Sequence, residues 1–300
     1  SLERLTVVSD TWAATFAGRE PLADFLSLVA SLSAERDPDV WGAALGPLGL
    51  LDRIISDTNR PLLQAFVQSV IEPVIADLGW EPAPDEPERC GTLRARLLAA
   101  LGTVGADPDV RAAAALRFSQ FLADPSSLPP DLVSAVLAIV SYSGGEAEYD
   151  LLLQRFRDAT TPQDEIRYLY ALAAPERPDL LRRTLDLALS GEVRSQDAPY
   201  LMGSILGSRA GASLAWPFIG EHWDTIRTRF PDNSIPRMLD AISAVVDPAL
   251  AHGIHAFLVE HPVPQEKLVA QSLEKLDNSV AFATRVAPDL PAALAPLAAT

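Results

Sequence analysis

Cysteine and lysine are almost absent from this sequence. Cys90 is the only cysteine among the 300 residues, and Lys267 and Lys275 are the only lysines. A single thiol excludes an intrachain disulfide and any zinc site built from several thiolates. It is compatible with a reducing compartment, and we therefore expect the chain to be cytoplasmic.

Long apolar runs are missing too. No segment holds the roughly 20 uninterrupted apolar residues that a membrane-spanning helix needs. The first residues, SLERLTVVSD, lack the basic region and apolar block of a signal peptide. We expect no membrane partner.

Positive charge is scarce relative to negative charge. The chain has 24 Lys and Arg against 40 Asp and Glu, which gives a net charge of −16. A nucleic-acid backbone is bound by basic side chains that neutralise its phosphates, so we expect no nucleic-acid partner. An acidic concave surface would instead attract cationic peptides.

The common catalytic motifs do not occur either. The sequence contains no His-Glu-x-x-His and no Gly-x-Ser-x-Gly, and both lysines follow glutamates, which excludes a phosphate-binding Gly-Lys-Ser/Thr loop. Carboxylates are so numerous that no pair of them stands out as a general acid and base. We assign no catalytic residue to this chain.

One group of histidines is a conceivable metal site. His252 and His255 are three residues apart and can share a helix face, with Glu260 and His261 following. However, His261 stands at an expected helix end before Pro262, so nothing brings it toward the other two. Surface histidines are the simpler interpretation, and we assign neither a metal ligand nor a cofactor to this chain.

The patterns that are present are those of helices. Apolar residues recur at helical spacing, as in Leu93, Leu97, Leu98 and Leu101. Four segments place a capping side chain directly before a proline at the first helical position, where its missing N–H costs nothing. The capping residues are Asp37, Asp107, Thr161 and Asp247.

These signals predict an all-α chain. Because connectors are short and pairs recur every 30 to 45 residues or so, we expect antiparallel helix pairs stacked as an α-solenoid of the HEAT or armadillo type. The predicted helices lie near 3–17, 21–34, 39–55, 60–77, 93–103, 108–123, 130–142, 146–159, 163–174, 178–190, 196–207, 210–229, 235–246, 248–260, 265–277 and 279–297.

A run of spaced glycines falls inside one predicted helix. Gly42, Gly46 and Gly49 lack the preceding strand of a dinucleotide-binding loop. We interpret them as positions of close helix packing.

The turn at 191–197 groups three polar side chains: Arg194, Gln196 and Asp197. In one interpretation Asp197 or Ser195 caps the next helix while Arg194 pairs with a nearby acid. In the other, the planar fork of Arg194 binds a peptide carboxylate. These three residues are our candidates for contact with a substrate.

Residues along most of the chain resemble those of a known family. The matches include Glu148-Tyr149-Asp150, the Thr161-Pro162-Gln163-Asp164 helix start, Glu192-Val193-Arg194-Ser195-Gln196-Asp197, Ala215-Trp216 with Phe218, Trp223-Asp224, Arg237-Met238-Leu239 and His261-Pro262-Val263-Pro264. In order and spacing they resemble the C-terminal helical domain of the M1 zinc aminopeptidases.

The resemblance implies a domain organisation. Residues 1–300 would form a single C-terminal helical domain, and the β-rich N-terminal domain and the catalytic zinc domain of the family are absent from this chain. The proline-rich segment 78–92 could be a domain linker, but a similar Leu-Gly-Trp-Glu turn in the family favours an ordered excursion between helices.

The resemblance also implies a function. The parent enzyme would remove N-terminal residues from peptides with zinc held in the absent domain. This chain would contact that catalytic domain and peptide substrates as a non-catalytic wall of the substrate chamber. Three alternatives remain: an independent HEAT-like scaffold, the same domain of a catalytically dead homologue and, least favoured, a metal enzyme using His252 and His255.

Overall fold

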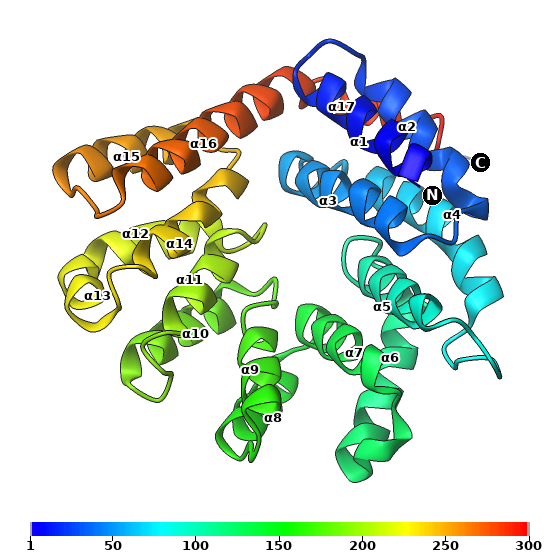
Figure 1. Ribbon diagram of the computed structural model, residues 1–300, viewed down its shortest axis with the longest axis horizontal. Helices are drawn as coiled ribbons and strands as arrows, with labels where there is room; N and C mark the ends of the chain where they lie inside the picture. The colour runs from blue at the N-terminus through cyan, green and yellow to red at the C-terminus, as the bar shows by residue number, and fades with distance from the viewer. Residues whose placement is uncertain (1, 299–300) are drawn as a thin grey trace. The chain divides into compact units, whose positions relative to one another are not determined.

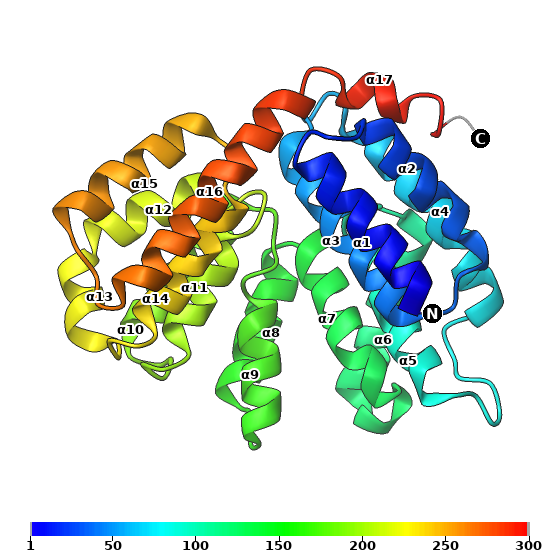
Figure 2. The same ribbon diagram turned by 45° about the horizontal axis from the view of Figure 1, so that its top comes forward.

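The computed structural model describes residues 2–298, and within them the chain is all-α, as predicted, with no strand. The helices divide into two compact units (Figures 1 and 2). The first unit contains the residues before Gly144 and those from Arg285 onward, and the second contains Gly144–Thr284.

The first unit is built from eight helices with two short 3₁₀ segments. They are α1 (Leu2–Phe16), α2 (Leu22–Ala30), η1 (Ser31–Ala34), α3 (Pro38–Ile54), α4 (Arg60–Leu78), α5 (Glu88–Gly102), α6 (Pro108–Ala123), η2 (Pro125–Ser127), α7 (Pro130–Ser143) and α17 (Leu290–Leu294). Helices α1, α3, α5 and α7 pack successively on one another, and α2, α4 and α6 pack beside them. Helix α17 returns to lie against α2 and α4 (Figure 2).

The second unit continues the same pattern of paired helices. It contains α8 (Glu146–Arg157), α9 (Pro162–Ala171), α10 (Pro178–Ser190), α11 (Ala198–Leu206), α12 (Ala212–Glu221), α13 (Trp223–Arg229), α14 (Ile235–Leu239), η3 (Asp240–Ala244), α15 (Pro248–Glu260) and most of α16 (Glu266–Val286). Helix α8 packs on α9, and α11 packs on α10, α12 and α14. Stacking of such pairs into a HEAT-like superhelix stays a prediction.

Each of the predicted capping residues occupies the N-cap position of its helix. Asp37 accepts a hydrogen bond from the Asp39 N–H (2.9 Å), and Asp107 accepts one from the Val110 N–H (2.6 Å). Thr161 accepts from the Asp164 N–H (3.1 Å), and Asp247 accepts from the Ala249 N–H (2.7 Å). Each bond satisfies one of the N–H groups that a helix start leaves without a partner.

The glycine run in α3 lies in a helix, but close packing is wrong for two of its members. A Cβ at Gly46 or Gly49 would meet no atom of another helix within 4 Å, whereas one at Gly42 would lie 3.1 Å from Arg96 Nη1. The glycines were interpreted from their spacing alone, which does not show whether another helix faces them.

The segment between α4 and α5 is held by one buried cation. Arg94, 2% exposed, donates to the carbonyl oxygens of Leu78 (3.1 Å) and Gly79 (2.9 Å) and to Glu86 Oε1 (2.9 Å). Arg117 lies 4.2 Å from the centre of the Trp80 ring, where a cation–π attraction acts. These contacts fix both ends of a segment that lacks secondary structure.

Candidate functional site

The 191–197 turn joins α10 to α11 and is held together by charge. Arg194 Nε donates to Asp197 Oδ2 at 2.6 Å, and Glu165 Oε1 lies 3.6 Å from the same nitrogen. Asp197 occupies the N-cap position of α11, but its side chain makes no capping hydrogen bond. The Arg194 guanidinium therefore already has acidic neighbours from two elements.

Gln196, the third predicted residue, is exposed, and its side chain makes no hydrogen bond with the described residues. Of the three candidates it alone has a side chain without a hydrogen bond to the described residues. A role for these residues in substrate contact stays a prediction.

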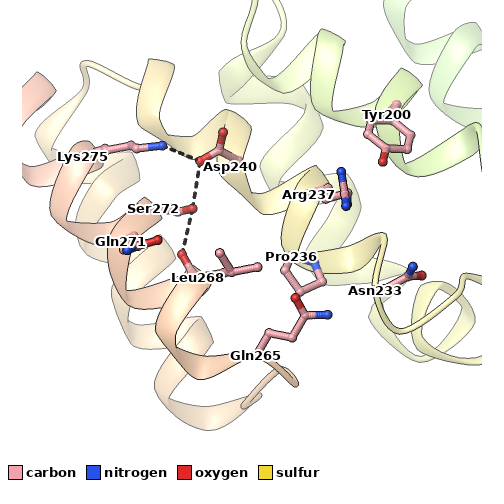
Figure 3. Close-up of a pocket in the computed structure, with 10 residues that line it drawn as sticks. All are labelled: Tyr200, Asn233, Pro236, Arg237, Asp240, Gln265, Leu268, Gln271, Ser272 and Lys275. Atoms are coloured by element: carbon pink, nitrogen blue, oxygen red, sulfur yellow. Dashed lines mark hydrogen bonds and ion pairs between the residues drawn. The ribbon is translucent and has the colours of Figure 1, made fainter.

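A polar pocket of about 670 Å³ lies beside this turn in the second unit (Figure 3). Helix α11 contributes Tyr200 to its lining, the loop before α14 contributes Asn233, and α14 contributes Pro236 and Arg237. The opposite side is formed by α16, with Leu268, Gln271, Ser272 and Lys275; Asp240 of η3 and Gln265 complete the lining. We call this space the α14–α16 pocket.

Tyr170 of α9 connects the turn to the pocket. Burial raises the pKa of its phenol, and the nearby Asp197 carboxylate and Tyr200 phenol raise that pKa further. Asp197 is the N-cap residue of α11, and Tyr200 stands three residues later in the first turn of that helix. The predicted turn and the pocket are thus neighbours.

Helical spacing explains which side chains face the pocket. In α14, Ile235, Met238 and Leu239 are buried, which leaves Arg237 between them on the exposed face. In α16, Leu268, Gln271 and Lys275 follow at intervals of three and four residues, so they share one face. The apolar faces of both helices are used for the core, and their polar faces meet across the pocket.

One carboxylate joins the two sides. Asp240 Oδ1 accepts hydrogen bonds from Ser272 Oγ (3.1 Å) and Lys275 Nζ (2.9 Å), as drawn in Figure 3. A further bond, from Ser279 Oγ to the Ser243 carbonyl oxygen (2.7 Å), ties α16 to η3. Lys275 and Asp240 thus form an ion pair in the lining of the pocket, with both side chains still exposed to solvent.

Arg237 is the remaining cation of the pocket. Its guanidinium lies between Tyr200 and Asn233 in Figure 3 and has no carboxylate partner among residues 2–298. Many other arginines of this unit do contact an acid: the pairs are Arg157–Glu192, Arg167–Asp164, Arg177–Asp179, Arg182–Asp186, Arg183–Asp150 and Arg194–Asp197. A guanidinium without a carboxylate partner in a chain of net charge −16 can accept an anionic ligand.

Neither Tyr200 nor Arg237 is among the residues predicted from the sequence. Arg237 belongs to the Arg237-Met238-Leu239 match but received no role, because nothing in the sequence shows that α16 faces it. Lys275 could have been selected from the sequence, since it is one of only two lysines.

His255 and His261 contact different partners. His255 Nε2 lies 2.7 Å from Asp277 Oδ1, and His261 Nδ1 lies 3.0 Å from the Phe257 carbonyl oxygen. His252 is exposed. Within residues 2–298, no three His, Cys, Asp or Glu side chains are grouped as metal ligands. The residues present therefore do not fit the zinc site that the resemblance implies for the parent enzyme.

The length and apolar character of a helix decide whether it can span a membrane. Over the described part of the chain, none combines the length and the apolar character needed to cross a bilayer.

Comparison with known proteins gives one family. The sequence model of the ERAP1-like C-terminal domain matches residues 1–278. Aminopeptidase M1 of Arabidopsis thaliana is 29% identical over 289 residues, which is 92% of this chain and 32% of that protein. Aminopeptidase M1-A of Oryza sativa subsp. japonica is 30% identical over 236 residues, 76% of this chain and 26% of that protein.

A third relative comes from an animal. Glutamyl aminopeptidase of Bitis rhinoceros is 26% identical over 254 residues, 83% of this chain and 26% of that protein. The chain thus spans about a third or less of the length of these relatives. Because the family match covers nearly all of its residues, the chain belongs to the family of ERAP1-like C-terminal domains, as the C-terminal region of M1 aminopeptidases.

Proposed function

We propose that this chain forms a wall of the substrate chamber of an M1 zinc aminopeptidase and controls access of peptides to it. The observation that carries the proposal is the family match over residues 1–278, together with relatives that are named aminopeptidases and are about three times as long. Zinc and the cleavage chemistry belong to a catalytic domain outside these residues, and that domain is the partner of this chain.

The contribution of this chain is binding. Contacts made to the part of a peptide remote from the cleaved bond supply binding energy that the reaction can use. The α14–α16 pocket suits this role, because its amide, hydroxyl and guanidinium groups are donors or acceptors for a peptide backbone and its ends. Arg194, Gln196 and Asp197 are part of the same proposed surface.

The proposal includes the organisation and location of the protein. It treats residues 1–300 as one C-terminal domain to which both compact units belong, with segment 78–92 as an ordered excursion within it. The single cysteine supports a cytoplasmic location because it requires no oxidising compartment.

The first test separates this chain from the parent enzyme. Purified chain 1–300 is expected to release no fluorophore from an aminoacyl-methylcoumarin reporter and to bind no stoichiometric zinc by elemental analysis. The complete protein that contains it is expected to hydrolyse the reporter. Chelator-sensitive hydrolysis by the chain alone would contradict the proposal, and an inactive complete protein would favour a scaffold or a catalytically dead homologue.

The second test asks whether the pocket meets peptide in the complete protein. A photo-crosslinking residue placed at Gln271 is expected to capture a decapeptide substrate. The same group at Leu116, an exposed residue of the first unit, is the control and is expected to capture little. Equal capture at both positions would count against a substrate-facing pocket.

A further inference from the structure

We infer that a groove between α1 and the end of α2 is the docking site of the residues that directly precede residue 1 in the complete protein. This inference rests on the proposed function, which makes the chain the C-terminal region of a longer protein. It goes further in naming the surface that the preceding polypeptide covers.

The groove is formed by the first two helices of the first unit, which lie side by side (Figure 2). It has a volume of about 620 Å³ and is lined by residues of two stretches, 3–8 and 28–35. Val8 and Leu32 in this lining are buried, whereas Val7 is 51% exposed. We call this space the α1–α2 groove.

Helix α1 is sparsely covered. Only Val8 and Thr15 are buried among its 15 residues, whereas α3, which packs against it, buries nine of its 17 residues. Glu3 and Val7 are four residues apart and therefore share the face of α1 that borders the groove. A groove with a buried apolar lining and an exposed Val7 beside it is typical of a surface that another segment covers.

The buried charge at the groove is satisfied within the chain. Glu35 is buried, and its carboxylate accepts hydrogen bonds from Arg4 (2.5 and 3.3 Å) and from two backbone N–H groups (2.8 Å each). Glu3 stands exposed at the edge. The groove therefore favours apolar side chains of an occupant, which would remove Val7 from water.

The position of the groove favours the residues directly before residue 1 as its occupant. Glu3 and Arg4 belong to the first turn of α1 and line the groove, so polypeptide that enters α1 passes its edge. About two thirds of Aminopeptidase M1 of Arabidopsis thaliana lies outside the region that this chain matches. A segment joined covalently at this position docks at a high effective concentration, which a separate peptide lacks.

A second copy of the chain and a separate partner protein fit the groove less well. A stable interface between separate chains uses about 20 to 30 residues on each side, whereas this groove is lined by residues of two short stretches. A covalently joined segment needs less contact area, because its docking loses little translational and rotational freedom.

Chemical labelling tests whether the groove is covered. Val7→Cys is a conservative change, and peptide mass spectrometry follows its alkylation by a maleimide in chain 1–300 and in the complete protein. The docked segment should slow the reaction at least about 10-fold in the complete protein. Leu116→Cys, at a position 58% exposed on α6, is the matched control and should react equally fast in both. A thermal melt verifies that each variant is folded, and equal rates at position 7 would overturn the inference.

Photo-crosslinking identifies the occupant. A photo-crosslinking residue placed at Val7 of the complete protein should be joined to the residues directly before residue 1, in a product with the mass of one chain. Peptide mass spectrometry maps the attachment. Capture of a distant segment, of a second copy or of another protein, or no capture at all, would overturn the inference.

Failure of the inference and failure of the proposed function give different results. If the complete protein has no aminopeptidase activity while position 7 is still covered by the preceding residues, the groove inference stands and the enzyme role falls. If the complete protein is active but position 7 reacts as fast as in chain 1–300, the enzyme role stands and the groove inference falls.

Discussion

Arg94 illustrates how much of this fold depends on single side chains. It is the only charged group that contacts both Leu78 and Gly79 as well as Glu86 among the described residues. Replacing it with Ala would leave a carboxylate and two carbonyl oxygens short of donors. We expect Arg94→Ala to lower the free energy of unfolding by about 3 to 5 kcal/mol, measured by urea denaturation.

The control for Arg94→Ala is a variant of an exposed ion pair. Arg157 of α8 and Glu192 of the 191–197 turn form an ion pair in which both side chains are exposed. Arg157→Ala should change the free energy of unfolding by less than about 1 kcal/mol. Similar losses in the two variants would show that the contacts of Arg94 contribute no more than a solvated ion pair.

The same contact predicts a pH dependence. The hydrogen bond from Arg94 lowers the pKa of Glu86 below the usual value of a glutamate, about 4.5. The unfolded chain therefore binds this proton more tightly, so the contribution of Glu86 is complete above about pH 4.5 and is lost as pH falls through the lowered folded pKa. We expect the stability difference between wild type and Glu86→Gln to shrink below pH 4.5 in urea titrations. A difference that grows on acidification would contradict this sign.

Arg53, unlike Arg94, is a cation whose removal should not destabilise the fold. Its Nε is buried without a hydrogen-bond partner among the described residues, and burial lowers the pKa of its guanidinium, although Asp52 partly offsets this. Removing a desolvated charge that lacks hydrogen bonds is often neutral or stabilising. Arg53→Met is expected to leave the free energy of unfolding unchanged or to raise it by about 1 kcal/mol. A loss above about 1 kcal/mol in urea denaturation would refute this.

At the scale of the helix, two glycines should respond in opposite ways to the same change. Gly253 is exposed in the middle of α15, and a Cβ there would meet no atom outside its own helix backbone within 4 Å. Gly253→Ala should therefore stabilise the chain by about 0.5 to 1 kcal/mol.

Gly102 ends α5 where it packs on α7. A Cβ there would lie 2.8 Å from two Ile139 side-chain atoms, so Gly102→Ala should destabilise by about 1 to 3 kcal/mol. Thermal melts of both variants check the pair. A shift of the same sign in both would mean that packing against Ile139 does not decide the outcome.

Most helices could be predicted from local signals. Caps such as Asp37 and Asp247 act within three residues of themselves, so their effect is visible in the sequence. Helix α5 begins at Glu88 rather than near residue 93, directly after Pro87, and the predicted helix at 210–229 is divided at His222. These boundaries depend on tertiary packing as well as on local preference.

The largest error concerns the last helices. A break was predicted at residue 278, but α16 runs without interruption from Glu266 to Val286. Asp277, Asn278 and Ser279 resemble a turn in sequence. In the structure the Ser279 hydroxyl donates to the Ser243 carbonyl oxygen, a partner 36 residues away, and α16 continues. The helix instead ends before Pro288, which cannot donate a backbone hydrogen bond.

The candidate pocket could be predicted only in part. Arg194 and Asp197 are close in sequence, and their pairing follows from their spacing. Asp240 and Lys275 are 35 residues apart, and Tyr200 and Arg237 stand on different helices, so only the packing of α11, α14 and α16 brings them together. Local patterns carry no information about that packing.

At the scale of the whole molecule, charge is the dominant property. A net charge of −16 should attract cationic peptides through a long-range field that salt screens, since the Debye length falls from about 10 Å at 0.1 M to about 3 Å at 1 M ionic strength. We expect association of a lysine-rich decapeptide with chain 1–300 to slow steeply as salt rises, measured by stopped-flow fluorescence. An uncharged peptide is the control, and equal salt dependence of the two rates would exclude such steering.

The anchoring of the segment between α4 and α5 has a practical consequence. Arg94 holds its ends in place, while Pro82, Ala83, Pro84 and Asp85 at its tip are exposed. An epitope tag or a fluorescent label inserted after Pro82 would extend this tip and leave the Ala83–Glu86 turn intact. The chain thus offers a place for a reporter that leaves its helices undisturbed.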